Sequence, residues 1–249
     1  MMQTIRCRAA GVTDPGLVRS ANEDAMLLRD DAGLWVVADG MGGHKDGEVA
    51  SGMIVSEMAV APMTGAFDVD LETLADVLHR ANAAIYDMGQ QTGGRAGSTV
   101  VVLLVQGARL GCLWAGDSRI YLLRERLLVQ LTRDHTQVQE MADRGLLQPH
   151  DVKGHPMGHL ITRAVGVEPE LLVDAVVDDL QPGDVILLCS DGLHGVADET
   201  EIAAILAGRN ADAASAALVE LARQRGAPDN VTAVCVVCEE VTALRLAGA

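Results

Sequence analysis

Short apolar runs of the kind that form β-strands recur along this chain, and they constrain its fold more than any other feature. They end at turn residues or carboxylates, and they are Leu34–Ala38, Thr99–Val105, Leu110–Ala115, Ile120–Leu123, Val173–Val177, Val185–Cys189 and Val231–Val237. Several are apolar at every position, which predicts strands that are covered on both faces. Gln106 and Gly107 separate two of the runs, which predicts a tight turn between antiparallel strands.

Two segments show clear helical periodicity. Apolar residues recur at steps of three and four along Leu71–Met88, which predicts a helix with one stripe facing a core. A second helix is predicted over Ala213–Gln224, and two more over about 47–61 and 136–144. The strand runs are grouped and do not alternate regularly with helices. The sequence therefore predicts an α+β fold in which sheets pack together and helices lie outside.

No repeat, low-complexity tract or charge run divides the 249 residues, so we expect one domain over residues 1–249. Within it, residues 134–163 hold four of the seven histidines and little apolar periodicity, which predicts a flap over a site. The formal net charge is −16, and this argues against nucleic acid as a partner, because phosphate backbones are bound by Lys and Arg.

No apolar run approaches the roughly 18 residues of a membrane-spanning helix, and no secretory signal is visible. We therefore expect a cytoplasmic protein without membrane insertion. The five cysteines lie mostly in apolar runs and are predicted to be reduced core residues. Cys235 and Cys238 form a C-x-x-C pair, but a spacing of three along a strand directs them to opposite faces. A metal or redox pair at these two cysteines is the alternative.

Four aspartates share one context, in which an apolar run lies next to a carboxylate beside a small or polar residue. They are Asp39, Asp117, Asp191 and Asp229. A carboxylate at a strand end projects at the rim of a sheet, and a neighbouring glycine lets a backbone carbonyl approach a ligand. Oxygen ligands suit Mg²⁺ or Mn²⁺, whereas no Cys and His cluster has the spacing of a zinc site. Each of these aspartates alone is more typical of a turn, but four together favour a metal site.

A charged segment lies upstream of the first clear strand and contains Arg19, Glu23 and Asp24. An arginine fork suits a phosphate group, and acidic neighbours suit metal-bound water. Taken alone, the same segment is typical of a solvated loop.

Eight ordered motifs make the chain similar to the metal-dependent serine/threonine protein phosphatases of the PP2C (PPM) family, in particular the compact bacterial type. The motifs lie at Arg19–Asp24, Ala38–His44, Gly97–Thr99, Ala115–Arg119, Leu131–His135, Leu160–Gly166, Leu188–Leu193 and Asp229–Thr232. The resemblance extends almost from end to end of the chain. It implies a four-layer sandwich of two packed antiparallel β-sheets flanked by pairs of α-helices, with a flap segment.

The resemblance also implies a binuclear Mn²⁺ or Mg²⁺ centre, with ligands assigned residue by residue. Asp39 would bridge the two ions, and the Gly40 carbonyl would bind one of them. Asp191 and Asp229 would complete the other. Asp117, together with Asp191, would hold a third and weaker ion.

Further residues receive catalytic roles from the same resemblance. Arg19 would hold the substrate phosphate, and Glu23 and Asp24 would hydrogen-bond metal-bound waters. Met41 occupies the position where animal members carry a histidine that protonates the leaving group. Methionine has no proton to donate, so His44 or a metal-bound water is the candidate for that role.

The implied activity is hydrolysis of phosphoserine and phosphothreonine in proteins, in which the metal centre activates a bridging water for direct in-line attack. The implied partners are phosphorylated proteins and a cognate bacterial Ser/Thr kinase whose action the enzyme opposes, and a monomer is expected. A pseudophosphatase that binds phosphoproteins without hydrolysing them is the main alternative. A small phosphorylated metabolite is the alternative substrate.

Overall fold

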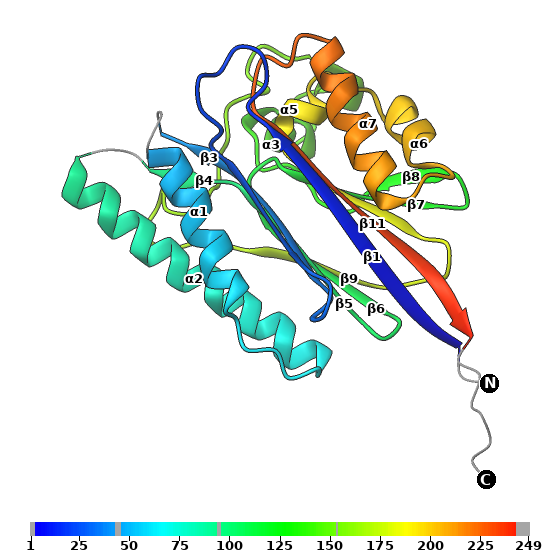
Figure 1. Ribbon diagram of the computed structural model, residues 1–249. Coiled ribbons are helices and arrows are strands. Elements are labelled where there is room, and N and C mark those ends of the chain that lie inside the picture. Colours follow the sequence, from blue (N-terminus) through cyan, green and yellow to red (C-terminus); the bar gives the residue numbers. More distant parts are fainter. Residues whose placement is uncertain (1–2, 43–45, 94–95, 153, 243–249) are drawn as a thin grey trace.

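Two antiparallel β-sheets stack face to face in the computed structural model, with helices on both outer faces (Figure 1). The structure describes residues 3–42, 46–93, 96–152 and 154–242. The first sheet contains, in spatial order, β1 (Gln3–Asp14), β11 (Val231–Thr242), β10 (Val185–Cys189), β7 (Arg119–Arg124) and β8 (Leu127–Gln130). The second contains β2 (Asp24–Arg29), β3 (Leu34–Met41), β5 (Val100–Gln106), β6 (Arg109–Ala115) and β9 (Asp174–Asp179), with β4 (Gly97–Ser98) beside β3.

The helices form the two outer layers. Helices α1 (Asp46–Ala59) and α2 (Phe67–Thr92) cover the second sheet. Helices α5 (Asp191–His194), α6 (Glu199–Leu206) and α7 (Ala211–Gln224) cover the first sheet. Within the described ranges, no helix is both long enough and apolar enough to cross a membrane. The expected α+β four-layer sandwich is confirmed.

Three buried apolar layers hold this sandwich together, and the alternation of side chains along each strand explains them. In β3, Val36 faces the α1–α2 layer, whereas Trp35 and Val37 face the opposite sheet. All three side chains are almost completely buried, and burying an apolar side chain of this size contributes about 1.5–3 kcal/mol. The continuously apolar runs are thus strands covered on both faces, as predicted.

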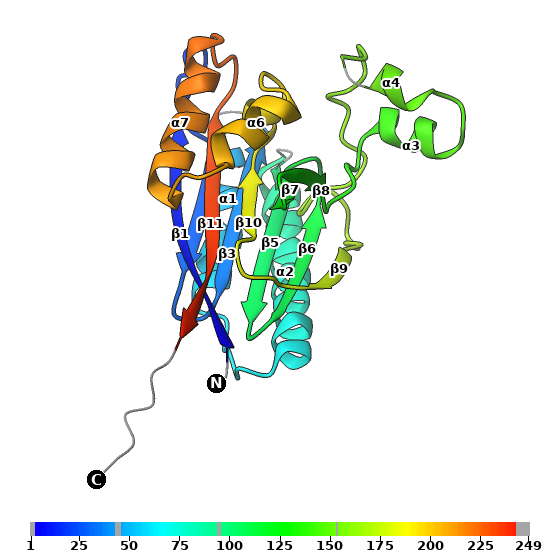
Figure 2. The same cartoon turned by 90° about the vertical axis from the view of Figure 1, so that its right-hand side faces the viewer.

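A lobe formed by residues 134–163, of which 153 lies outside the described part, projects from the sandwich (Figure 2). It carries α3 (Gln137–Asp143) and α4 (Pro149–Val152). Thr136 caps α3 by accepting a hydrogen bond from the Gln139 amide. The two ends of the lobe are joined at its base, where the Thr162 amide donates to the His135 carbonyl at 2.8 Å.

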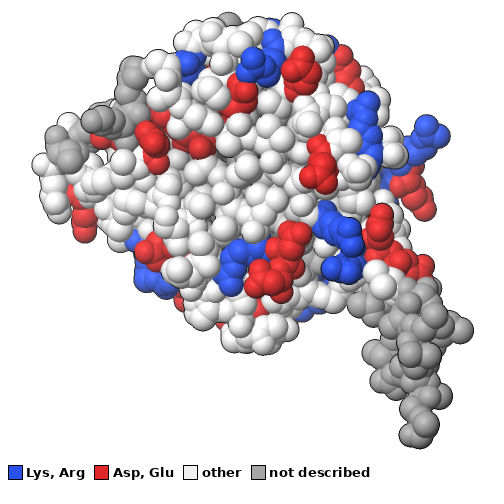
Figure 3. Space-filling model, viewed as in Figure 1, with Lys and Arg blue, Asp and Glu red and all other residues white. Residues whose placement is uncertain are grey.

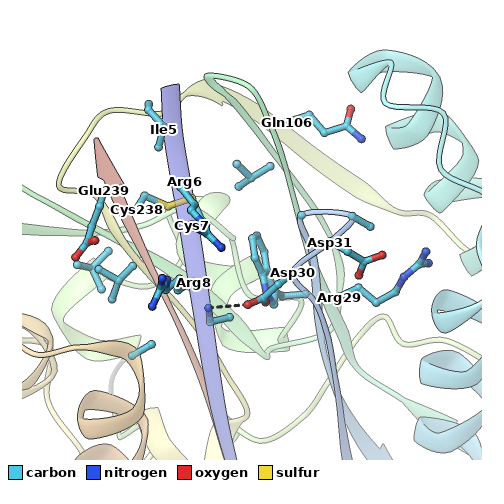
Figure 4. Close-up of a pocket in the computed structure, with 18 of the residues that line it drawn as sticks. Ile5, Arg6, Cys7, Arg8, Arg29, Asp30, Asp31, Gln106, Cys238 and Glu239 are labelled. Carbon is cyan, nitrogen blue, oxygen red and sulfur yellow. Dashed lines mark hydrogen bonds between the residues drawn. A yellow bond between two sulfur atoms is a disulfide. The ribbon is translucent and has the colours of Figure 1, made fainter. Parts of the chain in front are cut away.

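One prediction about the cysteines is wrong, because Cys7 and Cys238 form a disulfide that joins β1 to β11 (Figure 4). The two residues are direct partners in the antiparallel register, which brings their side chains together on one face. Cys112, Cys189 and Cys235 are free and buried. Cys235 and Cys238 do lie on opposite faces of β11, since they belong to different apolar layers.

The disulfide lines a cavity of about 1520 Å³ at the ends of the sheets where the β2–β3 and β5–β6 turns lie (Figure 4). Its walls carry both signs of charge, with Arg6 and Arg8 on β1 and Asp30 and Asp31 in the β2–β3 turn. Asp30 binds the Trp35 indole N–H at 2.8 Å, so this carboxylate has a role in the fold. None of the aspartates predicted to bind metal lines this cavity.

Candidate metal centre

The predicted acidic residues gather at the other end of the two sheets, and both sheets contribute. Asp24 begins β2, and Asp39 lies near the end of β3. Asp117 lies in the loop between β6 and β7. Asp191 follows β10 as the first residue of α5, and Asp229 precedes β11. Asp24 and Asp39 are direct partners in the β2–β3 register. The Asp39 and Asp191 carboxyl groups, one from each sheet, lie close enough for the charge of Asp191 to raise the pKa of Asp39. The structure therefore brings together aspartates that are far apart in the sequence.

Asp24 is held by hydroxyl groups from the opposite sheet. One of its carboxylate oxygens, Oδ2, accepts hydrogen bonds from Ser190 Oγ at 2.8 Å and Thr232 Oγ1 at 2.7 Å. The other oxygen, Oδ1, is buried and has no hydrogen-bond partner among the described residues. Burial raises the pKa of Asp24 to about 7, and the charges of Asp191 and Asp229 act in the same direction. This carboxylate is fixed in place but electrostatically unsatisfied.

The other carboxyl groups show the same imbalance. Burial raises the pKa of Asp39 well above its ordinary value, and the neighbouring aspartates raise it further. Burial also raises the pKa of Asp117 to about 7, with a further contribution from Asp191. Asp117 is only 5 % exposed, and its Oδ1 has no partner in the described part of the chain. Carboxylates that repel one another, two of them buried with an oxygen that has no partner in the described part of the chain, are the arrangement that a bound cation would stabilise.

The donor set fits a hard divalent cation that keeps part of its water shell. Across the described ranges, no three Asp, Glu, His or Cys side chains come close enough to enclose an ion by themselves. Mg²⁺ and Mn²⁺ prefer oxygen ligands, and Mg²⁺ usually keeps several waters and takes only a few protein ligands. An open group of aspartates is consistent with that preference, and a closed zinc-type cage is not.

Gly40 is required by the close approach of three backbone segments beside Asp39. A Cβ atom at this position would lie 2.2 Å from the Gly47 carbonyl oxygen and 2.6 Å from that of Glu23. The Gly40 amide donates to the Glu23 carbonyl at 3.1 Å. This packing holds the end of β3 against the start of α1, so the Asp-Gly pair here is not a hairpin turn.

Arg19 lies at the mouth of the acidic group, in the loop between β1 and β2. Its guanidinium donates to Asp229 Oδ2 at 2.7 Å, and its side chain is 57 % exposed. The hydrogen bond to Asp229 raises the pKa of Arg19, and the charges of Glu23 and Asp191 raise it further. A substrate phosphate at this position would therefore share the guanidinium with Asp229.

Asn230 ties the Arg19 loop to the start of β11, next to Asp229, a contact that the sequence alone did not indicate. Its side-chain oxygen accepts from the Glu23 amide at 2.8 Å, and its Nδ2 donates to the carbonyls of Pro15 and Ala21 at 2.9 Å each. Its place directly after Asp229 in a shared motif was the available signal. Ser190 and Thr232 also lie within the family motifs, but their contact with Asp24 joins segments that are far apart in the sequence.

The histidines separate into different environments. His44 lies outside the described residues. Burial lowers the pKa of His194 to about 3, so its neutral ring donates from Nε2 to the Asp117 carbonyl at 3.0 Å. His135 is buried at the base of the lobe, where its Nδ1 accepts from the Gly116 amide at 3.0 Å. His194 and His135 thus position the loop that carries Asp117.

Comparison with known proteins supports one family. The family model described as Protein phosphatase 2C matches residues 18–223. The serine/threonine protein phosphatase PstP of Mycobacterium tuberculosis is 40 % identical over 93 % of this chain, and the chain spans 45 % of the length of that relative. The serine/threonine phosphatase stp of Listeria monocytogenes is 34 % identical, with 90 % of this chain and 93 % of the relative covered.

Solved structures agree with the sequence comparisons. PppA of Pseudomonas aeruginosa, described as a key regulatory component of T6SS, superposes with a TM-score of 0.89 at 39 % identity, covering 95 % of this chain and 100 % of that one. The catalytic domain of PstP in complex with two manganese ions superposes with a TM-score of 0.84 at 35 % identity. The match covers 95 % of this chain and 100 % of that one. The four-layer architecture, the group of aspartates where the two sheets meet and these matches agree, and the chain belongs to the protein phosphatase 2C family.

Proposed function

We propose that this chain is a metal-dependent phosphatase that hydrolyses phosphoserine and phosphothreonine in proteins. The observation that carries the proposal is the group of aspartates at the junction of the two sheets, in which the buried Asp24 and Asp117 each keep one oxygen without a partner among the described residues. Arg19 lies beside this group at the surface, where it meets an incoming anion.

Asp39, the Gly40 carbonyl, Asp191 and Asp229 are proposed to hold two Mn²⁺ or Mg²⁺ ions, and Asp117 with Asp191 a third. When bound, two such ions lower the pKa of a coordinated water so that it acts as the nucleophile. The aspartates would supply the negative charge that retains the ions. The ions would in turn relieve the mutual repulsion of the aspartates.

The residues of the chain position the substrate and the water. Arg19 binds the phosphate oxygens and offsets the negative charge on them in the transition state. Ser190 and Thr232 fix Asp24 through two hydrogen bonds, so Asp24 is held ready to orient a water molecule. Glu23 is proposed to act with Asp24, since its carboxylate lies against Gly47 beside the same group. Met41 has no proton to donate, and His44 is the proposed donor to the leaving group.

The test is hydrolysis of a phosphothreonine peptide after chelation, and again after Mn²⁺ or Mg²⁺ is restored. We expect activity only with metal, and at least about a 100-fold loss in Asp39→Asn and Asp191→Asn. Asp76→Asn changes an exposed carboxylate on α2 and is the matched control, with wild-type activity expected. A wild-type protein that binds the peptide but hydrolyses it with neither metal would instead establish the pseudophosphatase alternative.

We further propose that the protein works as a monomer in the cytoplasm and opposes a Ser/Thr kinase. The support is the protein phosphatase 2C family membership and the names of the relatives, which are serine/threonine phosphatases. Cytoplasmic reductants keep most thiols reduced, so this location requires that the Cys7–Cys238 bond be open for much of the time. Alkylation of free thiols in freshly lysed cells, followed by mass spectrometry, measures the fraction that is open.

A further inference from the structure

A groove of about 950 Å³ opens beside Asp117 and Asp191 and runs between the lobe and helices α5 and α6. Its lobe side is lined by Val138, Gln139 and Ala142 among others. This volume is at the upper end of the range for ligand pockets and far exceeds the space that one phosphate group fills. The groove therefore offers room for polypeptide that flanks a phosphorylated residue.

At the floor of the groove, the Arg119 guanidinium is already paired within a network of hydrogen bonds. Arg119 donates to the Asp134 carboxylate at 2.6 Å and to the Tyr121 hydroxyl at 2.7 Å. Gln130 also donates to Asp134 at 2.7 Å. Arg133, on the lobe side, forms an ion pair with Asp143. Neither arginine is therefore free to attract an acidic ligand.

Glu199 differs from these groups because its carboxylate is exposed and has no partner among the described residues. It is the first residue of α6 and lines the groove opposite the lobe. It forms no hydrogen bond or ion pair with the rest of the described chain. Its neighbour Asp198 is engaged in the α6 capping box with Glu201. Burial raises the pKa of Tyr121, and the charge of Glu199 also raises it, which places this carboxylate near the floor of the groove.

We infer that the groove binds the segment next to the phosphorylated residue and that Glu199 selects a lysine or arginine in that segment. The inference rests on the proposed phosphatase function. Apart from the metal-binding aspartates, the described lining holds two arginines against three carboxylates, namely Asp134, Asp198 and Glu199. Asp117, whose buried Oδ1 has no partner among the described residues, also lines the groove. A basic side chain is the occupant that this charge arrangement favours.

The test uses phosphothreonine peptides that carry a single Lys or a single Glu at each flanking position in turn. At one or more positions, the wild type is expected to prefer the Lys peptide over the Glu peptide by about two- to fivefold in kcat/KM, the range of a partly exposed ion pair. Glu199→Gln should bring this ratio close to one, and Glu199→Lys should reverse it. Because each ratio is taken within one variant, differences in total activity between variants cancel.

Glu57→Lys on α1 is the matched control, because it makes the same charge change at an exposed site outside the groove and should keep the wild-type ratio. Thermal unfolding verifies that each variant is folded. Equal rates on all peptides, or a preference that Glu199→Lys does not change, would overturn the inference. Hydrolysis of para-nitrophenyl phosphate separates the two proposals. A wild-type protein that does not hydrolyse this small substrate would contradict the phosphatase function itself.

Discussion

Replacing Asp117 by asparagine is expected to stabilise the metal-free protein at neutral pH. Asp117 is 5 % exposed, one of its carboxylate oxygens has no partner within the described ranges, and the charges of Asp191 and Asp134 oppose its ionisation. An asparagine has almost the same shape and carries no charge, and its side-chain N–H groups suit these neighbouring carboxylates. The substitution therefore removes a repulsion while the packing is kept.

The magnitude follows from the pKa of Asp117, which is raised from 3.8 to about 7. The folded state then binds more protons than the unfolded state between about pH 4 and pH 7, so the stability of the wild type falls as the pH rises through that window. A rise of about three units at about 1.4 kcal/mol each sets a ceiling of about 4 kcal/mol above pH 7. Relaxation of the neighbouring side chains lowers this ceiling. We expect Asp117→Asn to raise the free energy of unfolding by about 2 kcal/mol, or the Tm by about 4–8 °C.

The assay is thermal unfolding of the wild type, Asp117→Asn and the exposed control Asp76→Asn in the presence of a chelator at pH 7.5 and pH 5. The gain in Tm for Asp117→Asn should shrink by more than half at pH 5, where most of the wild-type Asp117 is protonated. Added Mn²⁺ should raise the Tm of the wild type, because a ligand that binds only the folded state stabilises it. A gain that is absent at pH 7.5, or equal at the two pH values, would refute the electrostatic reasoning.

Three further predictions concern other parts of the structure. Without reductant, Cys7→Ser should lower the free energy of unfolding in urea by about 3–5 kcal/mol, because the disulfide closes a sequence separation of 231 residues; with reductant, the difference should vanish. Asp70 is fully buried and accepts four hydrogen bonds, which lower its pKa to about 2 despite burial. Asp70→Asn should therefore lower the free energy of unfolding by about 2 kcal/mol at pH 7, and this difference should fade as the pH falls from about 4 to 2. A difference that stays constant with pH would contradict this. Arg19→Ala should reduce kcat/KM for a phosphopeptide by about 10- to 100-fold, with partial rescue by Arg19→Lys, and an unchanged rate would exclude phosphate binding by Arg19.

The central strands were predictable because both of their faces are covered, which makes their sequences apolar at every position. The edge strand β1 was missed because its outward side chains include Arg6 and Arg8, which break the apolar run. Its partner is β11, at the other end of the chain, so nothing in the local sequence indicates the pairing. The disulfide was missed for the same reason, since Cys7 and Cys238 meet only through that register.

Within the candidate site, the aspartates were predictable because each follows or precedes a strand and combines with other family motifs. Their supporting contacts were not, because each joins distant segments. Ser190 and Thr232 lie 166 and 208 residues from the Asp24 carboxylate that they bind. The Arg19–Asp229 pair likewise depends on a loop whose path follows from Asn230. Residue type predicted the ligand chemistry, and tertiary structure determined the geometry.

The pairing of the first strand with the last has a consequence for synthesis on the ribosome. During translation, β1 emerges well before β11 and has no neighbour in its sheet until β11 is made, because β11 is its only partner there among the described strands. Asp229, just before β11, is also among the last site residues to appear. A nascent or prematurely terminated chain therefore has an open sheet edge and an incomplete acidic centre. The proposed phosphatase activity therefore requires that synthesis has already passed β11.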